Sequence, residues 1–180
     1  ELNDIVSKLS NGQRLSLSDG HILYHHSSLY EVGQLANLVK IARYGKHVFF
    51  NSNVHINQTN ICVLACKFCA FRRSKKQTDA YELSIENYLE EMAKFSKSID
   101  EVHSVGGLHP DWDVNFYVDL ISAAKEKFPE ISIKALTAVE IKHLSQQSGI
   151  TFTETLTQLR NAGLDSLPGG GAEILNDSIR

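Results

Sequence analysis

All three cysteines of this 180-residue chain lie in one stretch of eight residues, CVLACKFC at positions 62–69. Soft thiolates in such a cluster select iron–sulfur centres, zinc or copper(I) rather than magnesium or calcium. A 4Fe-4S cluster normally takes four cysteine ligands, so three cysteines would leave one iron open to a substrate. The rest of the chain is therefore expected to fold as a scaffold that presents this loop.

Two other interpretations of the cysteines stay open. Three cysteines and one histidine can close a structural zinc site, with His55, His103 or His109 as the fourth ligand. Zinc ribbons usually pair two short C-x-x-C knuckles, however, and the sequence lacks that pattern. Free cysteines also occur as small buried hydrophobes, but those are usually scattered. A disulfide framework is disfavoured because the count is odd and small secreted frameworks are much denser in cysteine.

The segments around the cysteines alternate between extended and helical patterns. Strand-like stretches lie at 54–57, 101–107, 131–137 and 164–167. Helical spacing of apolar residues recurs at 85–99, 112–127, 139–147 and 152–161. Strand followed by helix recurs four times, with one extra helix before the last strand and the fourth helix only beginning at the end of the chain, and this order predicts a parallel sheet with right-handed crossovers. The cysteine loop follows the first strand, and chemistry in a parallel (β/α) barrel is located at that carboxyl end.

The predicted fold class is α/β, as the N-terminal portion of a parallel (β/α) barrel of the TIM type that is incomplete in this chain. Complete barrels of this type need ~250 residues. Residues 1–50 are predicted to be a helical lead-in that packs on the barrel, and residues 51–180 to be its first half. A half barrel exposes an apolar sheet edge and inner face, so self-association is expected.

Within the lead-in, the pattern predicts a short helix followed by a turn at 18–20 and a loop that contains three histidines. These are His21, His25 and His26. A longer helix is then predicted to begin at Ser28, with Glu31 completing a capping box, and to end at Gly45.

The composition excludes several classes of partner. Eighteen basic and twenty-one acidic side chains give a net charge of −3, which argues against a nucleic-acid backbone as partner. No apolar run approaches the ~20 residues that cross a bilayer, so no membrane association is expected, and the start does not resemble a signal peptide. Free thiols favour a reducing compartment, so a cytoplasmic location is expected.

The sequence around the cysteines resembles the radical S-adenosylmethionine (SAM) superfamily. Cys62, Cys66, Phe68 and Cys69 match its signature, including the aromatic residue before the last cysteine. The stretches FNSNVHINQTNICVLACKFCAFRR, GGLHPD, IKALTAVEIKHLSQQSG and AGLDSLPGGGAEIL look like its menaquinone (futalosine pathway) branch. Futalosine cyclases and deazaflavin synthase subunits share the cysteine loop and the glycine-rich ending. The stretch 134–141 resembles the aminofutalosine synthases most.

The resemblance implies a 4Fe-4S cluster on Cys62, Cys66 and Cys69, with SAM bound at the unique iron. Reduction would split SAM into methionine and a 5′-deoxyadenosyl radical. In aminofutalosine synthases, which are transferases, this radical adds to 3-[(1-carboxyvinyl)oxy]benzoate to give 6-amino-6-deoxyfutalosine. The alternative within the branch is dehypoxanthine futalosine cyclase or a related radical SAM enzyme, and the alternative of another class is a structural zinc-binding module.

The resemblance also implies cofactor contacts near the first two strands. Phe68 is expected to shield the cluster and to offer its backbone to adenine. Gly106 and Gly107 match the motif whose backbone contacts the methionyl amino group of SAM. Two positions depart from the family pattern: Leu108 replaces a glutamate, and Val54 replaces an arginine.

Further candidates for cofactor binding follow the third and fourth strands. Thr137 and Glu140 come at the end of the third strand. Gly169, Gly170 and Glu173 belong to a turn that matches the family's PGGGAEI. Successive glycines before a helix expose backbone N–H groups to a carboxylate or phosphate. Glu140 and Glu173 are expected to contact ribose or substrate.

Four basic side chains follow the cysteine loop, namely Arg72, Arg73, Lys75 and Lys76. A solvated loop would account for them. The alternative hypothesis is that they attract an acidic electron donor, such as reduced flavodoxin or ferredoxin, by electrostatic steering. No side chain is singled out as catalytic.

Overall fold

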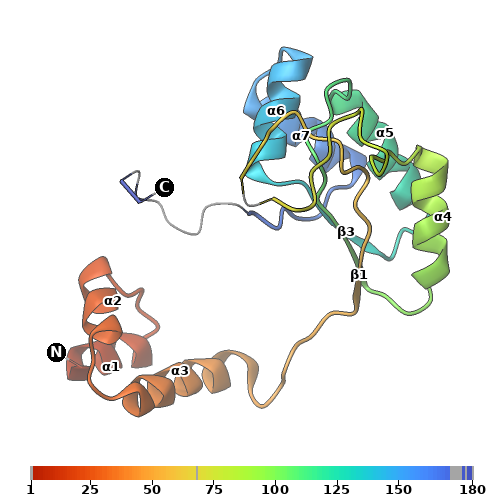
Figure 1. The fold of residues 1–180 in the computed structure, drawn as a ribbon. Helices are drawn as coiled ribbons and strands as arrows, with labels where there is room; N and C mark the ends of the chain where they lie inside the picture. Colours follow the sequence, from red (N-terminus) through yellow and green to blue (C-terminus); the bar gives the residue numbers. More distant parts are fainter. Residues whose placement is uncertain (1, 68, 171–175, 177, 180) are drawn as a thin grey trace. The chain divides into compact units, whose positions relative to one another are not determined.

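The computed structural model describes residues 2–67, 69–170, 176, 178 and 179. The chain divides into two compact units, Glu1–Phe50 and Asn51–Arg180 (Figure 1). In the described residues, the first unit contains helices only, and the second contains helices and a sheet. Within the described ranges, no helix combines the length and apolar character that a membrane span requires.

The first unit contains the helices α1 (Leu2–Ser10), α2 (Leu17–Tyr24) and α3 (Leu29–Tyr44). The predicted turn at 18–20 is wrong, because those residues lie within α2. Ser16 and Asp19 form a capping box that begins this helix.

A contact between α1 and α2 also defines this unit. The Lys8 ammonium of α1 donates to the Asp19 carboxylate of α2 at 2.7 Å, which joins the two helices. The predicted loop with three histidines is also wrong in part, because His21 lies within α2. His25 caps the end of α2, and His26 follows it. The helix predicted to begin at Ser28 is confirmed as α3, with the Ser28 hydroxyl accepting from the Glu31 amide. The predicted capping box is wrong, because the Ser28 amide donates to His26 Nδ1 rather than to the Glu31 carboxylate.

The second unit contains a three-stranded parallel sheet in the order β1-β2-β3. The strands are β1 (Asn53–His55), β2 (Glu101–Ser104) and β3 (Ser132–Ala135). Val54 pairs with Val102, and Val102 pairs with Ile133, so these three side chains occupy one row across the sheet. The predicted parallel sheet is confirmed.

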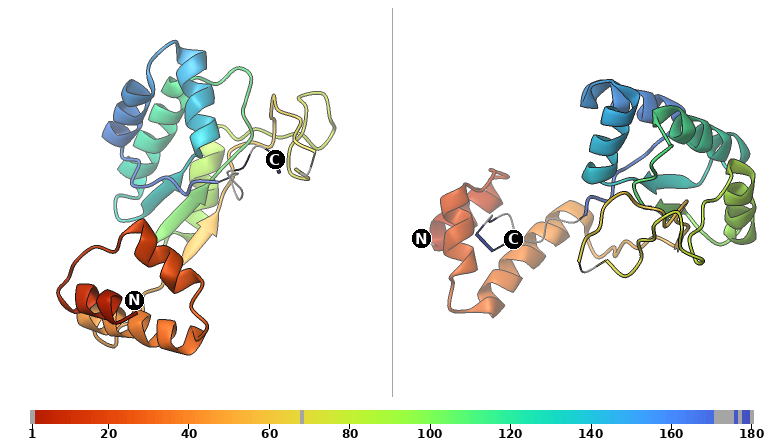
Figure 2. Two further views of the ribbon diagram at one scale, coloured as in Figure 1. Left: turned by 90° about the vertical axis from the view of Figure 1, so that its left-hand side faces the viewer. Right: turned by 45° about the horizontal axis from the view of Figure 1, so that its top comes forward.

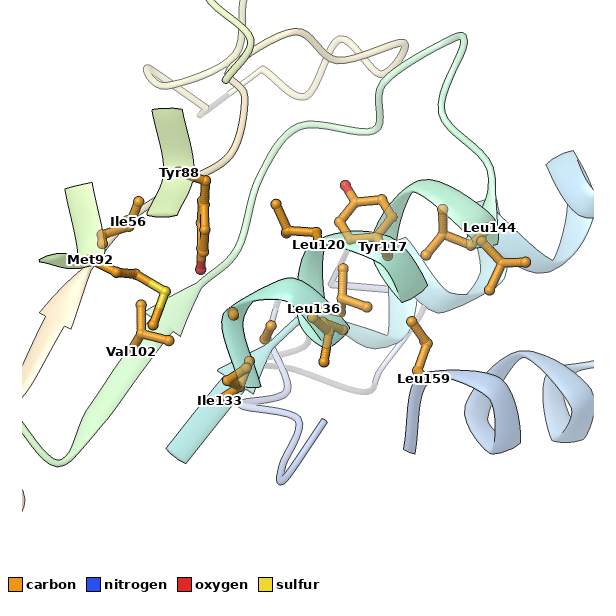
Figure 3. Close-up of a cluster of buried hydrophobic side chains, with 14 of the residues drawn as sticks. Ile56, Tyr88, Met92, Val102, Tyr117, Leu120, Ile133, Leu136, Leu144 and Leu159 are labelled. Carbon is orange, nitrogen blue, oxygen red and sulfur yellow. The ribbon is translucent and has the colours of Figure 1, made fainter. Parts of the chain in front are cut away.

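Helices cover one face of this sheet (Figure 2). They are α4 (Ile85–Phe95), α5 (Val114–Lys127), α6 (Ala138–Ser148) and α7 (Phe152–Ala162). The row with Val102 and Ile133 packs against buried residues of these helices, as Figure 3 shows for Met92, Leu120 and Leu159. Each helix begins at a side-chain cap, and the caps are Ser84, Asp113, Thr137 and Thr151. The helices therefore cover the face of the sheet that carries Val54, Val102 and Ile133, and they leave the other face uncovered.

The strand predicted at 164–167 does not form. Only a single parallel bridge, between Lys134 and Ser166, joins this segment to β3 in the described residues. The Asp165 carboxylate accepts a hydrogen bond from the Ile133 amide at 2.7 Å. A side chain thus takes the place that a backbone carbonyl would have in a continued ladder, which explains why pairing stops after one bridge.

Candidate cluster and cofactor site

A buried polar segment connects β1 to the cysteine loop. Thr59 and Asn60 are almost fully inaccessible to solvent. The Thr59 hydroxyl donates to the Tyr81 carbonyl at 2.7 Å, and the Asn60 amide donates to the Asp79 carbonyl at 2.9 Å. The segment that returns after the cysteine loop is therefore fixed to the segment that enters it. Sequence reasoning missed these residues, because polar side chains without periodic spacing give no signal of burial.

Backbone hydrogen bonds hold the first half of the cysteine loop. The amide of Cys62 donates to the Arg73 carbonyl at 2.9 Å, and the amide of Val63 donates to the Leu108 carbonyl at 3.0 Å. The amide of Cys69 donates to the Cys66 carbonyl at 3.2 Å. The loop is thus anchored both to its own return segment and to the loop that follows β2.

The three thiols are free and accessible, with Cys66 exposed and Cys62 and Cys69 half-buried. Among the described residues, no group of three or more His, Cys, Asp or Glu side chains is gathered as a metal site. The cysteines share one anchored loop, but their thiols are not brought to a common point. Phe68 lies outside the described residues. Three soft, accessible donors in one loop nevertheless fit an iron–sulfur cluster with an open iron.

The glycine pair after β2 lies directly against the segment that leads to Cys62. A Cβ atom on Gly107 would lie 2.1 Å from the Ile61 carbonyl oxygen, and one on Gly106 would lie 2.6 Å from Gln58 Nε2. The Gly107 amide donates to the Thr59 carbonyl at 2.9 Å. Glycine is required here because the two backbones touch, which is a structural role in addition to the predicted cofactor contact.

Glu140 links the loops that follow β2 and β3. Its carboxylate accepts from the Gly106 amide at 3.0 Å through Oε1 and from the Thr137 amide at 2.7 Å through Oε2. Thr137 and Glu140 form the capping box of α6. Only 3% of Glu140 is exposed, so its carboxylate is engaged with protein groups. Burial raises the pKa of Glu140, and the bonds from Gly106 and Thr137 oppose that rise.

Glu140→Gln is expected to flatten the pH dependence of stability. Because the pKa of Glu140 is raised in the folded state, the unfolded chain releases this proton at lower pH than the folded chain. Between the two pKa values the folded state holds more protons, so the free energy of unfolding falls as pH rises. The glutamine variant lacks this fall. Urea unfolding at several pH values measures the slope.

Glu154→Gln is the matched control, because Glu154 occupies the same capping position at the start of α7. Glu154 is exposed, and hydrogen bonds from Thr151 lower its pKa. A lowered pKa gives stability that is present above the unfolded value and is lost as pH falls. Removing it should therefore change the slope in the opposite sense. Equal slopes in wild type and Glu140→Gln would contradict the assignment for Glu140.

The glycine-rich turn approaches the end of β3. Gly169 and Gly170 have φ angles of +76° and +141°, which favour glycine. A Cβ atom on Gly170 would lie 3.3 Å from the Thr137 methyl group, so the turn and the start of α6 are adjacent. Leu136, next to Thr137, is fully buried and has a φ of +67°. Glu173 lies outside the described residues.

His109 joins the loop after β2 to the segment that follows the cysteines. Its ring is buried, and Nε2 lies 2.7 Å from the Glu82 carboxylate. Nδ1 accepts a hydrogen bond from the Asp111 amide at 3.2 Å. The ring also stacks on Trp112 at 4.2 Å between centroids. Because both ring nitrogens have partners, His109 would have to give one up to become a zinc ligand.

Two of the four basic residues after the cysteine loop are paired with acidic residues. Arg73 Nε lies 2.6 Å from the Asp79 carboxylate, and the Lys75 ammonium pairs with the Asp111 carboxylate. These pairs reduce the positive field that could steer an acidic partner.

The two positions that depart from the family pattern are both packed. Leu108, which replaces the family glutamate, is buried, and Val54 packs against the core.

Residues 56–180 match the family model of the Radical SAM superfamily. The chain belongs to the radical SAM superfamily. This match includes the anchored cysteine loop, the glycine pair after β2 and the capping box of α6. The family predicted from the motifs is therefore confirmed.

Several curated proteins resemble this radical SAM chain. Aminodeoxyfutalosine synthase from Thermus thermophilus is 37% identical over 177 residues, covering 98% of this chain and 48% of that protein. The enzyme of the same name from Streptomyces coelicolor is 38% identical, covering 98% and 46%. Cyclic dehypoxanthine futalosine synthase from Halalkalibacterium halodurans is 34% identical, covering 99% and 49%. The chain spans about half the length of the curated relatives it matches.

A solved structure supports the fold. The crystal structure of methylornithine synthase matches with a TM-score of 0.57 and 19% sequence identity, covering 91% of this chain and 57% of that one. The predicted α/β architecture around a parallel sheet is therefore confirmed for the part of the fold that this chain contains.

Proposed function

We propose that the protein containing this chain is a radical SAM transferase that makes 6-amino-6-deoxyfutalosine from SAM and 3-[(1-carboxyvinyl)oxy]benzoate, in menaquinone biosynthesis. The observation that carries the proposal is the 37% identity to an aminodeoxyfutalosine synthase across 98% of this chain. The anchored loop with three accessible cysteines supports the same chemistry.

In this proposal, Cys62, Cys66 and Cys69 hold a 4Fe-4S cluster. With SAM bound, the cluster would supply a 5′-deoxyadenosyl radical, and the protein would orient the substrate relative to it. The methionyl amino group is a hydrogen-bond donor, so Gly106 and Gly107 would meet it through their carbonyl oxygens. Their amides already donate to Glu140 and Thr59.

The loops after β3 would form the next wall of the cofactor site. Gly170 lies against Thr137 in the structure, Gly169 precedes it in the chain, and Glu173 follows in the family pattern. Glu140 holds Gly106 in place through its carboxylate. We therefore assign Glu140 a positioning role, because its carboxylate is engaged with protein amides.

The proposed enzyme also needs an electron donor and a reducing compartment. An acidic one-electron donor, reduced flavodoxin or ferredoxin, would approach the basic residues that follow the cysteine loop. The cytoplasm provides the reducing conditions that the thiols require. The packing of residues 1–50 on the barrel and self-association of this chain both stay predictions.

Product analysis tests this function. Full-length protein with a reconstituted cluster is incubated anaerobically with dithionite, SAM and 3-[(1-carboxyvinyl)oxy]benzoate. The proposal requires a product that contains both adenosyl and benzoate carbons. The second candidate is the cyclase, favoured by 34% identity to cyclic dehypoxanthine futalosine synthase. Cyclised product from dehypoxanthine futalosine, with no adduct from the benzoate, would favour the cyclase.

A further inference from the structure

The face of the sheet opposite the helices has a row of basic side chains. His55 of β1 pairs with His103 of β2, and His103 pairs with Lys134 of β3. Side chains alternate between the two faces of a strand. Because Val54, Val102 and Ile133 pack towards the helices, the row of His55, His103 and Lys134 faces away from them, on the side that forms the interior of a barrel.

The two histidines of this basic row are in contact, and the lysine is held by a carboxylate. The imidazole rings of His55 and His103 lie 4.3 Å apart between centroids. The Lys134 ammonium lies 3.1 Å from Glu101 Oε1, and the Asn51 amide donates to the same oxygen at 2.9 Å. Glu101 is buried, whereas His103 and Lys134 are half-buried and His55 is exposed. The row is therefore open on the side away from the helices.

The charge of the row depends on the two histidines, because Glu101 balances Lys134. The pKa of His103 is lowered by burial, then by the positive charges of His55 and Lys134, while Glu101 opposes this shift. The ring therefore favours its neutral form near neutral pH. A bound anion would offset the repulsion between protonated His103 and its positive neighbours, and would so raise the pKa of His103. Anion binding should thus be coupled to proton uptake.

The position of the row relates it to the chemistry. His55 is the last residue of β1, and His103 and Lys134 each lie one residue before the end of their strands. The carboxyl ends of the strands are where (β/α) barrels carry their active sites. Cys62 follows His55 by seven positions in the chain. A ligand held by the two histidines would therefore lie towards the end of the sheet from which the cysteine loop extends, and it would draw on the Lys134 ammonium that pairs with Glu101 at the start of β2.

We propose that His55, His103 and Lys134 bind the carboxylate of the second substrate, the small carboxylic acid that reacts with the SAM-derived radical. This inference rests on the proposed function, since it gives that site its substrate class. The row supplies two imidazole N–H donors and an ammonium, which suit a carboxylate. Glu101 and Asn51 position Lys134 and do not contact the ligand.

Calorimetry with 3-hydroxybenzoate as the probe tests this inference on the full-length protein with its cluster. His103→Gln and Lys134→Gln are expected to weaken binding of the probe by ~10-fold or more, the effect of losing a charge-assisted contact. The matched control is Lys142→Gln, an exposed lysine on α6, which should leave the affinity unchanged. His103→Gln keeps the test valid if Lys134→Gln, which leaves Glu101 without its cation, fails to fold.

Changes of pH and of ligand sharpen the test. Affinity for 3-hydroxybenzoate should fall as pH rises through the pKa of His103, with proton uptake visible as a dependence of the heat on buffer. 3-Hydroxybenzyl alcohol, which lacks the carboxylate, should bind the wild type and variants equally weakly. SAM affinity, measured by equilibrium dialysis, should be retained in both variants.

Two results would overturn the inference. One is unchanged and pH-independent binding of 3-hydroxybenzoate in both variants. The other is loss of SAM affinity instead, which would mean that the row holds the methionyl carboxylate. Failure of the proposed function is distinguishable from either result, because it would appear as absent radical chemistry while the row still bound the probe.

Discussion

Cys66→Ala is expected to remove the iron–sulfur cluster and lower reductive cleavage of SAM by ~100-fold or more, since a cluster with two protein ligands is not held. Cys66 is the most exposed of the three cysteines. Its side chain contributes little to packing, so the free energy of unfolding should change by less than ~0.5 kcal/mol. Iron and sulfide analysis, together with 5′-deoxyadenosine formation, measures the loss.

Lys67→Ala is the control for this change, because Lys67 is exposed and adjacent to Cys66 in the same loop. It should keep the cluster and the cleavage of SAM. If Cys66→Ala retained iron, sulfide and 5′-deoxyadenosine formation at the level of Lys67→Ala, then Cys66 would not be a ligand. Loss of all three in both variants would instead mean that the loop tolerates no change.

Gly107→Ala is expected to destabilise the second unit by ~1–3 kcal/mol or more, the range of overpacking. The added Cβ atom would lie 2.1 Å from the Ile61 carbonyl oxygen and 2.6 Å from its carbonyl carbon. These are backbone atoms, so relief requires a shift of the chain next to Cys62. We therefore expect weaker cluster binding together with the lower stability, measured by urea unfolding and by iron content.

Gly33→Ala provides the comparison, because Gly33 lies within α3 and a Cβ atom there would have no neighbour within 4 Å. Alanine in a helix interior is favoured over glycine by ~0.5–1 kcal/mol. That variant should be as stable as the wild type or more so. If Gly107→Ala unfolded at the same urea concentration as the wild type, the close approach to Ile61 would be contradicted.

Local signals in the sequence predicted most of the fold. The predicted cap Ser28 accepts from the first turn of α3 in the structure, because capping depends on residues three positions apart. Ser84 and Thr151 cap α4 and α7 in the same way. Ser16 and Asp19 form the same kind of cap, but the sequence analysis predicted a turn and a loop there instead of α2. The prediction of a fourth strand was wrong because the Asp165 carboxylate accepts a hydrogen bond from the Ile133 amide, which is distant in sequence, and this bond limits the pairing.

The site was predictable only in part. Cysteine spacing and family motifs identified the loop, because its ligands are adjacent in sequence. The contact between Glu140 and Gly106 joins residues 34 positions apart, and no local pattern reports such a bond. The basic row on the sheet likewise depends on strand register, which places His55 beside His103. Functional neighbours from different strands become visible only once the sheet is known.

Electron paramagnetic resonance of the dithionite-reduced full-length protein, with and without SAM, tests the central claim most directly. A cluster held by Cys62, Cys66 and Cys69 has one iron with no protein ligand, so addition of SAM should change the signal of the reduced cluster. A signal that SAM leaves unchanged would indicate a fourth protein ligand. Colourless protein that contains zinc and no iron would contradict the account outright.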